Sequence, residues 1–412
     1  MTNFFKTYRY ELGLILFGLF WLTIVDFLLQ TSSQNYIFAD SDNYLVAAKN
    51  LMVYHRGHDY RPILISFIYG IPFLFGANDA TVYLFSFYIN LICWFSTAVL
   101  IYKITTFIIR PKLAFYFTLL FYSSVGTLTL LYHLLSENLY TFWILLAFFL
   151  ILRHYQSQKF WYLSLALAVL VSSMLIRPGS KWLAIVFCLY FVRVLWKNYA
   201  HKAMILFYSS WMLIVIQCAG LYHQFGNFTI SYIDSITYYN YIGSKAICFK
   251  EGKEYTEINN PRANVLLKLK DRDTITKVAK ADFVEQLKTN KINLLKAYFS
   301  DIFNNTSSGS AAIAVLKNER NSTFFESSKE AFFDISKWQN RVFTIVGLLL
   351  AIIYFFKSYK KEMFFTLISS YILYIIAVSG ITFSQGDRFH MVFYPMVIVL
   401  LVKWLKDRKL IS

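Results

Sequence analysis

The residue types best suited to chemistry lie in the polar segment 36–62, YIFADSDNYLVAAKNLMVYHRGHDYRP, which follows the first apolar run. Asp40 precedes an apolar pattern of helical spacing that starts near Tyr44. We expect a carboxylate near the hydrocarbon boundary to have a raised pKa, which suits a general base. Asp42 stands where the N-cap of this helix belongs, so it either bonds the first free amides or takes part in the chemistry. Asp40 and Asp42 are therefore the candidate catalytic carboxylates.

Cations that could bind a phosphate follow in the same segment and recur far along the chain. The first group consists of His55, Arg56, His58 and Arg61, which would bind either a substrate phosphate or lipid headgroups. Three later motifs hold further cations together with other candidate residues. They are YHLLSENLY with Glu137, LIRPGSKW with Arg177 and Lys181, and SQGDRFHMVFYPM with Arg388, His390 and Tyr394. Glu137 also suits the first turn of a helix, and Arg177 also suits a membrane anchor.

The composition of the 412-residue chain predicts a polytopic membrane protein. It is 57% hydrophobic and 20% aromatic, with 15% charged residues where a soluble domain has about 25%. The net charge of +17 is better explained by cationic loops that set topology than by nucleic-acid binding. The four cysteines show no metal-ligand spacing.

Apolar runs long enough for helices that cross a ~30 Å hydrocarbon core recur along the chain. The run 63–77 is short and is interrupted by Gly70 and Pro72, so we expect it to lie at the interface. The remaining runs predict about ten spans, at 12–29, 81–103, 113–132, 138–152, 160–176, 182–196, 203–222, 342–356, 363–383 and 389–405.

The distribution of lysine and arginine supports this count. With ten spans, the clusters around 103–112, 193–202 and 357–361 all fall on the cytoplasmic side, and both termini lie there too. The candidate residues then gather on the opposite, extracytoplasmic face. The residue usage, rich in Lys, Asn, Ile, Tyr and Phe, is typical of an AT-rich bacterium, so we expect the bacterial inner membrane.

The predicted organisation has three parts. Residues 1–222 form a transmembrane catalytic module with the outer loop 30–78, residues 223–340 form an external segment, and 341–412 hold the last transmembrane helices. The external segment is expected to be mostly helical, with helices near 263–270 and 277–303 and a turn of small polar residues at 304–310.

The order of these features resembles the GT-C superfamily of integral-membrane glycosyltransferases. It is most similar to enzymes that use polyprenyl-phosphate sugars, such as aminoarabinose transferase and protein O-mannosyltransferases. The resemblance rests on DSDNY in the first outer loop, RPILISFIYGIPFLFG after it, SENL, LIRPG and RFHMVFYPM, and on seven spans before the external segment. The sequence departs from the family where Ser41 separates Asp40 from Asp42 and where Arg61-Pro62 replaces Lys-Pro-Pro.

This resemblance implies an all-α GT-C-like fold and an inverting glycosyl transfer. The donor would be a sugar on a polyprenyl phosphate, and the acceptor a lipid-linked glycan, an envelope polysaccharide or a protein. Asp40 or Asp42 would act as the base, and we expect neither a metal nor another cofactor. The cations Arg56, Arg61, Arg177, Lys181 and Arg388 would bind the donor phosphate, supported by His55, His58, Glu137, His390 and Tyr394.

Two other functions also fit the sequence. A polysaccharide polymerase or ligase acting on a lipid pyrophosphate would share the spans and the basic outer loops, but would rely on arginines and a histidine rather than a carboxylate in the first loop. A transporter of lipid-linked sugars would place charges along a path within the helices, whereas here they gather at one surface.

Overall fold

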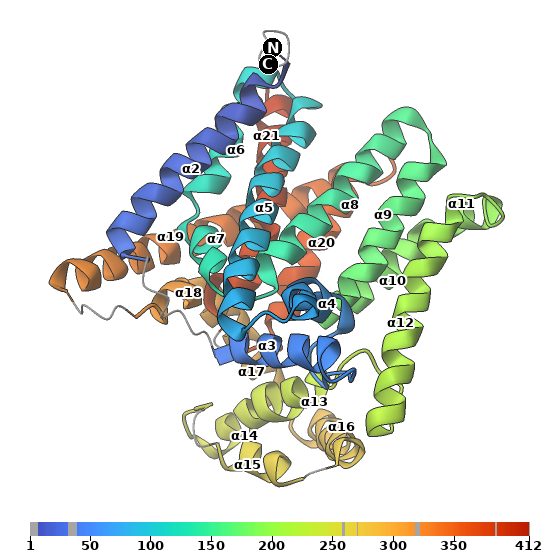
Figure 1. Ribbon diagram of the computed structural model, residues 1–412, viewed down its shortest axis with the longest axis vertical. Helices are drawn as coiled ribbons and strands as arrows, with labels where there is room; N and C mark the ends of the chain where they lie inside the picture. Colours follow the sequence, from blue (N-terminus) through green and yellow to red (C-terminus); the bar gives the residue numbers. More distant parts are fainter. Residues whose placement is uncertain are drawn as a thin grey trace.

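The computed structural model describes residues 7–31, 39–257, 260–269, 271–317, 322–383 and 385–411. All regular elements in these segments are helices, and no strand occurs among the described residues (Figure 1). The expected all-helical class is confirmed.

Six helical segments are long and apolar enough to cross a membrane, which confirms a polytopic membrane protein. They are α2 (Arg9–Leu29), α5 (Asp79–Thr106), α8 (Glu137–Ser157), α12 (Met204–Phe225), α19 (Thr323–Lys357) and Gly386–Asp407. The last segment comprises η6 (Gly386–Phe389), η7 (Met391–Phe393) and α21 (Tyr394–Asp407). The start of α2 and the end of α21 lie at the same end of the molecule (Figure 1).

The other four predicted spans correspond to shorter or interrupted helices. They are α6 (Pro111–Ser123) with α7 (Val125–Thr129) and η2 (Leu130–Tyr132), α9 (Phe160–Ser172) with η3 (Ser173–Leu175), α10 (Lys181–Tyr190) with α11 (Val192–Lys197), and α20 (Met363–Ser379). If the bent pair 111–132 counts as one span, seven segments are long and apolar enough. The count of ten therefore stays a prediction.

The break within 111–132 has a long-range cause. The chain bends by 65° at Ser124, whose backbone is extended. Gln339 of α19 accepts a hydrogen bond from the Val125 amide (3.1 Å) and donates one to the Ser123 carbonyl (2.6 Å). Because backbone groups freed inside an apolar bundle need partners, this one side chain stabilises the bend.

The segment between α2 and α5 contains two short helices, α3 (Ala39–Met52) and α4 (Ile63–Gly70), the second continued by η1 (Ile71–Phe75). α3 lies across the ends of the long helices (Figure 1). Gly70 lets α4 approach α3 closely, since a Cβ there would lie 2.7 Å from Met52 Cγ. The prediction that Asp42 is an N-cap is wrong, because α3 begins at Ala39 and places Asp42 within its first turn.

The segment from 223 to 340 is mostly helical, as predicted. Its elements before α19 are α13 (Ile233–Ser235), the π-helix η5 (Ile236–Gly243), α14 (Ser244–Glu251), α15 (Pro261–Lys268), α16 (Arg272–Thr289), α17 (Lys291–Ser307) and α18 (Ala311–Ala314). α13 to α16 cover the end of the bundle opposite the start of α2 (Figure 1).

Two predicted boundaries in this segment are wrong. The single helix at 277–303 is two helices that meet at Asn290, whose buried side chain donates to the Ala246 carbonyl (3.3 Å). The turn at 304–310 starts later, because α17 continues through Ser307. The predicted end of the first helix at Lys270 lies outside the described residues.

Candidate active site

Five charged residues from distant parts of the chain form one cluster where α3 meets the ends of the long helices. Asp40 lies in the first turn of α3, Arg61 directly before α4, and Glu137 at the start of α8. Arg177 lies between η3 and η4 (Pro178–Ser180), and Arg388 lies in η6. We call these five residues the charged cluster.

Asp40 bridges two arginines of the charged cluster. Its Oδ1 lies 2.8 Å from Nη2 of Arg61, and its Oδ2 lies 3.0 Å from Nη1 of Arg388. Its side chain is 31% exposed, which is the largest exposed fraction among the five side chains of the charged cluster. Asp40 is thus the carboxylate of the cluster that a solute can reach.

Glu137 anchors Arg388 from the opposite side and is 1% exposed. Its Oε1 accepts a hydrogen bond from Nε of Arg388 and lies 2.8 Å from Nη2 of the same guanidinium. Nη1 of Arg177 lies 3.8 Å from this Oε1. Glu137 is also the acid in the first turn of α8, where a negative charge favours the helix dipole. A buried ion pair needs such additional hydrogen bonds to offset desolvation.

Aromatic rings and an amide orient the guanidinium groups. Arg61 lies over the ring of Tyr44 at 4.2 Å, and Arg177 lies over Phe389 at 4.3 Å. Arg388 donates to Oε1 of Gln385 (3.1 Å). Cation–π contacts are strengthened when the cation is desolvated, so these rings help to fix the directions of the cations.

The environment of Asp40 contradicts the expected raised pKa. Burial alone would raise the pKa of this carboxyl, but the charges of Arg388 and Arg61 and their hydrogen bonds outweigh burial. The pKa of Asp40 is therefore lowered, and the carboxylate stays ionised. The expectation failed because it considered the hydrocarbon boundary without the two arginines that the fold brings to it.

The charged cluster can accept an additional anion. Three guanidinium groups and two carboxylates leave one net positive charge. Within the described part of the chain, buried Nε of Arg61 and buried Nη1 of Arg177 have no hydrogen-bond partner. Two donors without partners and a net positive charge suit the oxygens of a phosphate monoester.

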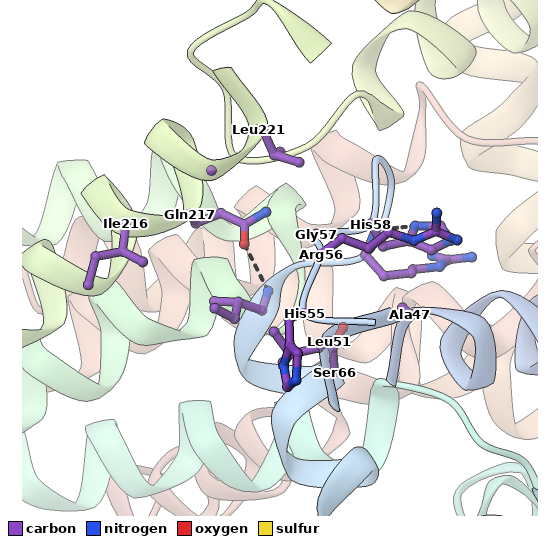
Figure 2. A pocket seen from close by; sticks show the side chains of 13 residues that line it. Ala47, Leu51, His55, Arg56, Gly57, His58, Ser66, Ile216, Gln217 and Leu221 are labelled. Carbon is purple, nitrogen blue, oxygen red and sulfur yellow. Dashed lines mark hydrogen bonds between the residues drawn. The ribbon is translucent and has the colours of Figure 1, made fainter. Parts of the chain in front are cut away.

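A pocket of about 190 Å³ opens beside Arg61. Figure 2 shows residues of the 53–62 loop, among them His55, Arg56 and His58, facing Ile216, Gln217 and Leu221 of α12 across this pocket. Gln217 accepts from the Ile63 amide (3.1 Å) and so ties α12 to the start of α4. One side of the pocket is cationic and the other is mainly apolar.

Arg56 and His58 of the 53–62 loop have local partners. Arg56 donates to Asn50 (3.1 Å), and His58 Nδ1 accepts from the Tyr60 amide (3.1 Å) and lies 3.1 Å from Asp59. His55 is exposed and has a positive φ of 51°. These residues line the pocket but do not join the charged cluster.

Four further candidates lie away from the charged cluster. Asp42 is exposed and accepts from Tyr83 of α5 (3.0 Å), and Lys181 pairs with Asp234 of α13. His390 lies 2.9 Å from Thr344, and Tyr394 donates to Asn340 (3.1 Å), both within the bundle. His390 lies between η6 and η7, and Tyr394 is the first residue of α21, so both connect the start of the last membrane segment to α19.

Sequence reasoning missed the neighbours that orient the cations. Tyr44 was assigned only to an apolar face, although its position four residues after Asp40 places both on one side of a helix. Gln385 and Phe389 flank Arg388 closely in sequence, but no spacing rule marks them as its partners.

Among the described residues, no three His, Cys, Asp or Glu side chains are placed to hold a metal ion. Comparison of the chain with protein-family models, curated proteins and solved structures finds no match.

Proposed function

We propose that the chain is an inverting glycosyltransferase that moves a sugar from a polyprenyl phosphate to a hydroxyl acceptor on the extracytoplasmic face. The observation that supports this best is the position of Asp40. It is a partly exposed carboxylate held between Arg61 and Arg388, in a helix that crosses the ends of the long apolar helices. A base beside phosphate-binding cations is what a single displacement from a sugar phosphate requires.

In the proposed reaction, the acceptor oxygen attacks the anomeric carbon while the bond from that carbon to the phosphate oxygen breaks. The acceptor proton passes to Asp40, and the polyprenyl phosphate leaves as a monoester with one more negative charge. Arg61, Arg177 and Arg388 stabilise that charge. Such electrostatic stabilisation is strongest in a site that contains little water. A monophosphate carries less charge than a pyrophosphate, so the cluster needs no metal.

In this proposal the donor also adjusts the basicity of Asp40, whose pKa is lowered in the free site. A donor phosphate would compete with Asp40 for Arg61 and Arg388, the groups that keep its pKa low. Donor binding would then raise the pKa of Asp40 and make it a stronger base when the acceptor is present.

The pocket beside Arg61 suits the donor lipid near its phosphate. Arg56 and His58 lie on its loop side, and apolar residues of α12 lie across from them (Figure 2). In the proposed arrangement ten spans place both termini in the cytoplasm of a bacterium, and 223–340 binds a glycan or protein acceptor outside.

The test is transfer from a radiolabelled polyprenyl-monophosphate sugar by purified protein in liposomes, with the corresponding lipid-pyrophosphate glycan as matched donor. The proposal predicts release of polyprenyl phosphate, an inverted anomeric linkage in the product, and activity that survives EDTA. Use of the pyrophosphate donor alone would favour a polymerase or ligase, and movement of donor across the bilayer without transfer would favour a transporter.

A further inference from the structure

Helix α17 exposes a row of large apolar side chains on its outward face. Its outward side chains include Ile292, Leu295, Phe299 and Phe303, which are 66%, 56%, 59% and 70% exposed. These positions are spaced at i, i+3, i+7 and i+11, so they form one stripe along the helix. A surface helix of a soluble domain would turn such a stripe toward the core.

The inward face of α17 buries two polar side chains beside Leu294 and Ala297. Asp301 is fully buried and pairs with Lys245 of α14 at 2.5 Å. Asn305 is also fully buried and donates to the carbonyls of Ser379 (2.9 Å) and Thr382 (3.0 Å). These two polar side chains are thus already bonded within the protein, and the apolar stripe is left outside.

The position of α17 places this stripe beside apolar membrane segments. Tyr298 donates to the Ala377 carbonyl near the end of α20 (2.8 Å), and Asn340 of α19 donates to the Asn305 carbonyl (2.6 Å). From the level of Asn340 onward, exposed apolar side chains continue along α19 at helical spacing, at Val342, Ile345, Leu349 and Ile352. The part of α17 from Tyr298 to Asn305 therefore lies beside the ends of two apolar helices, next to the start of the exposed apolar row of α19.

We infer that α17 lies at the membrane surface on the end of the bundle where α3 lies. The side chains of its outward stripe, Ile292, Leu295, Phe299 and Phe303, then contact acyl chains. The exposed lysines Lys291 and Lys296 extend from the same helix toward headgroups. The neighbouring helix α16 differs, since most of its exposed side chains are charged or polar. This inference does not depend on the proposed function.

The test measures where a spin label on α17 lies, using the full chain in lipid nanodiscs after replacement of the four cysteines. Phe299→Cys and Phe303→Cys are labelled and compared with Leu349→Cys on α19 and Leu287→Cys on α16, all of them exposed positions. Collision with oxygen, which concentrates in lipid, is compared with collision with a water-soluble nickel chelate.

We expect both α17 labels to have an oxygen-to-nickel ratio close to that of Leu349→Cys and well above that of Leu287→Cys. A ratio like that of Leu287→Cys would mean that water covers the stripe and would overturn the inference. Low collision rates with both reagents would mean that protein, such as a second copy of the chain, covers it, and would also overturn the inference.

Discussion

Asp40 is ionised in the resting site because two arginines outweigh the effect of its burial. Its lowered pKa means that the stability gained from these contacts is present above the unfolded pKa of about 4 and is lost as pH falls through the lower folded value.

We predict that kcat/KM for the donor, which reports the ionisation of the free enzyme, shows no acid limb from Asp40 above about pH 5. Arg61→Gln removes one of the two cations, so its acid limb should move to higher pH whatever its absolute rate. Both profiles are measured in the transfer assay. An acid limb near pH 6 in the wild type that Arg61→Gln leaves in place would contradict this account of Asp40.

Glu137 is expected to matter for stability as well as for the orientation of Arg388. Glu137→Ala removes one of the two carboxylates that pair with the buried Arg388 and leaves Asp40 as the other. Loss of one partner of a buried pair costs roughly 3–5 kcal/mol. The measurement is thermal unfolding in detergent, with Glu251→Ala, which breaks an exposed pair with Lys253, as the matched control. Equal unfolding temperatures for the two variants would show that Glu137 is not held as described.

At the scale of elements, η6 carries Arg388, and its Asp387 side chain approaches Gly126 of α7 closely. A Cβ on Gly126 would lie 2.2 Å from Oδ2 of the buried Asp387, next to Arg388. We predict that Gly126→Ala displaces η6, costs about 1–3 kcal/mol of stability, and lowers transfer. Both unfolding and transfer are measured.

Gly179→Ala is the control for this substitution, because a Cβ at that position meets no atom within 4 Å. It should behave as the wild type does. If Gly126→Ala were equally silent, the close packing of α7 on η6 would be refuted.

The helices themselves could be predicted from the sequence because apolar runs of sufficient length have few alternatives in a membrane protein. The interruptions could not, because their causes lie far away in the chain. The bend at Ser124 depends on Gln339, and the break at Asn290 depends on the Ala246 carbonyl. No local pattern contains those partners.

The candidate site was predictable to the same extent. Residue type, predicted membrane side and the resemblance to the GT-C superfamily selected Asp40, Arg61, Glu137, Arg177 and Arg388, which the structure brings together. The same reasoning also selected Lys181, His390 and Tyr394, whose partners Asp234, Thr344 and Asn340 are set by tertiary packing. It gave the wrong direction for the pKa of Asp40 because that depends on contacts between distant segments.

At the scale of the whole molecule, the arrangement of the helices predicts that the two ends of the bundle lie on opposite sides of the membrane. The end of α21 lies away from α13–α16 (Figure 1). We predict that Lys253→Cys, whose native side chain is 70% exposed, reacts with an impermeant maleimide from outside intact cells, and that Lys409→Cys reacts only in inverted membranes. Labelling of both from the same side would contradict the topology.

The most direct test of the central claim compares Asp40→Asn with Asp42→Asn in transfer from a polyprenyl-phosphate sugar. The two residues lie in the same helical turn, but Asp42 is exposed and bonded to Tyr83, whereas Asp40 joins Arg61 and Arg388. Loss of a general base typically costs 10²–10⁴-fold in rate, so we predict a loss of about that size for Asp40→Asn and near wild-type transfer for Asp42→Asn. Full activity of a folded Asp40→Asn protein would contradict the account.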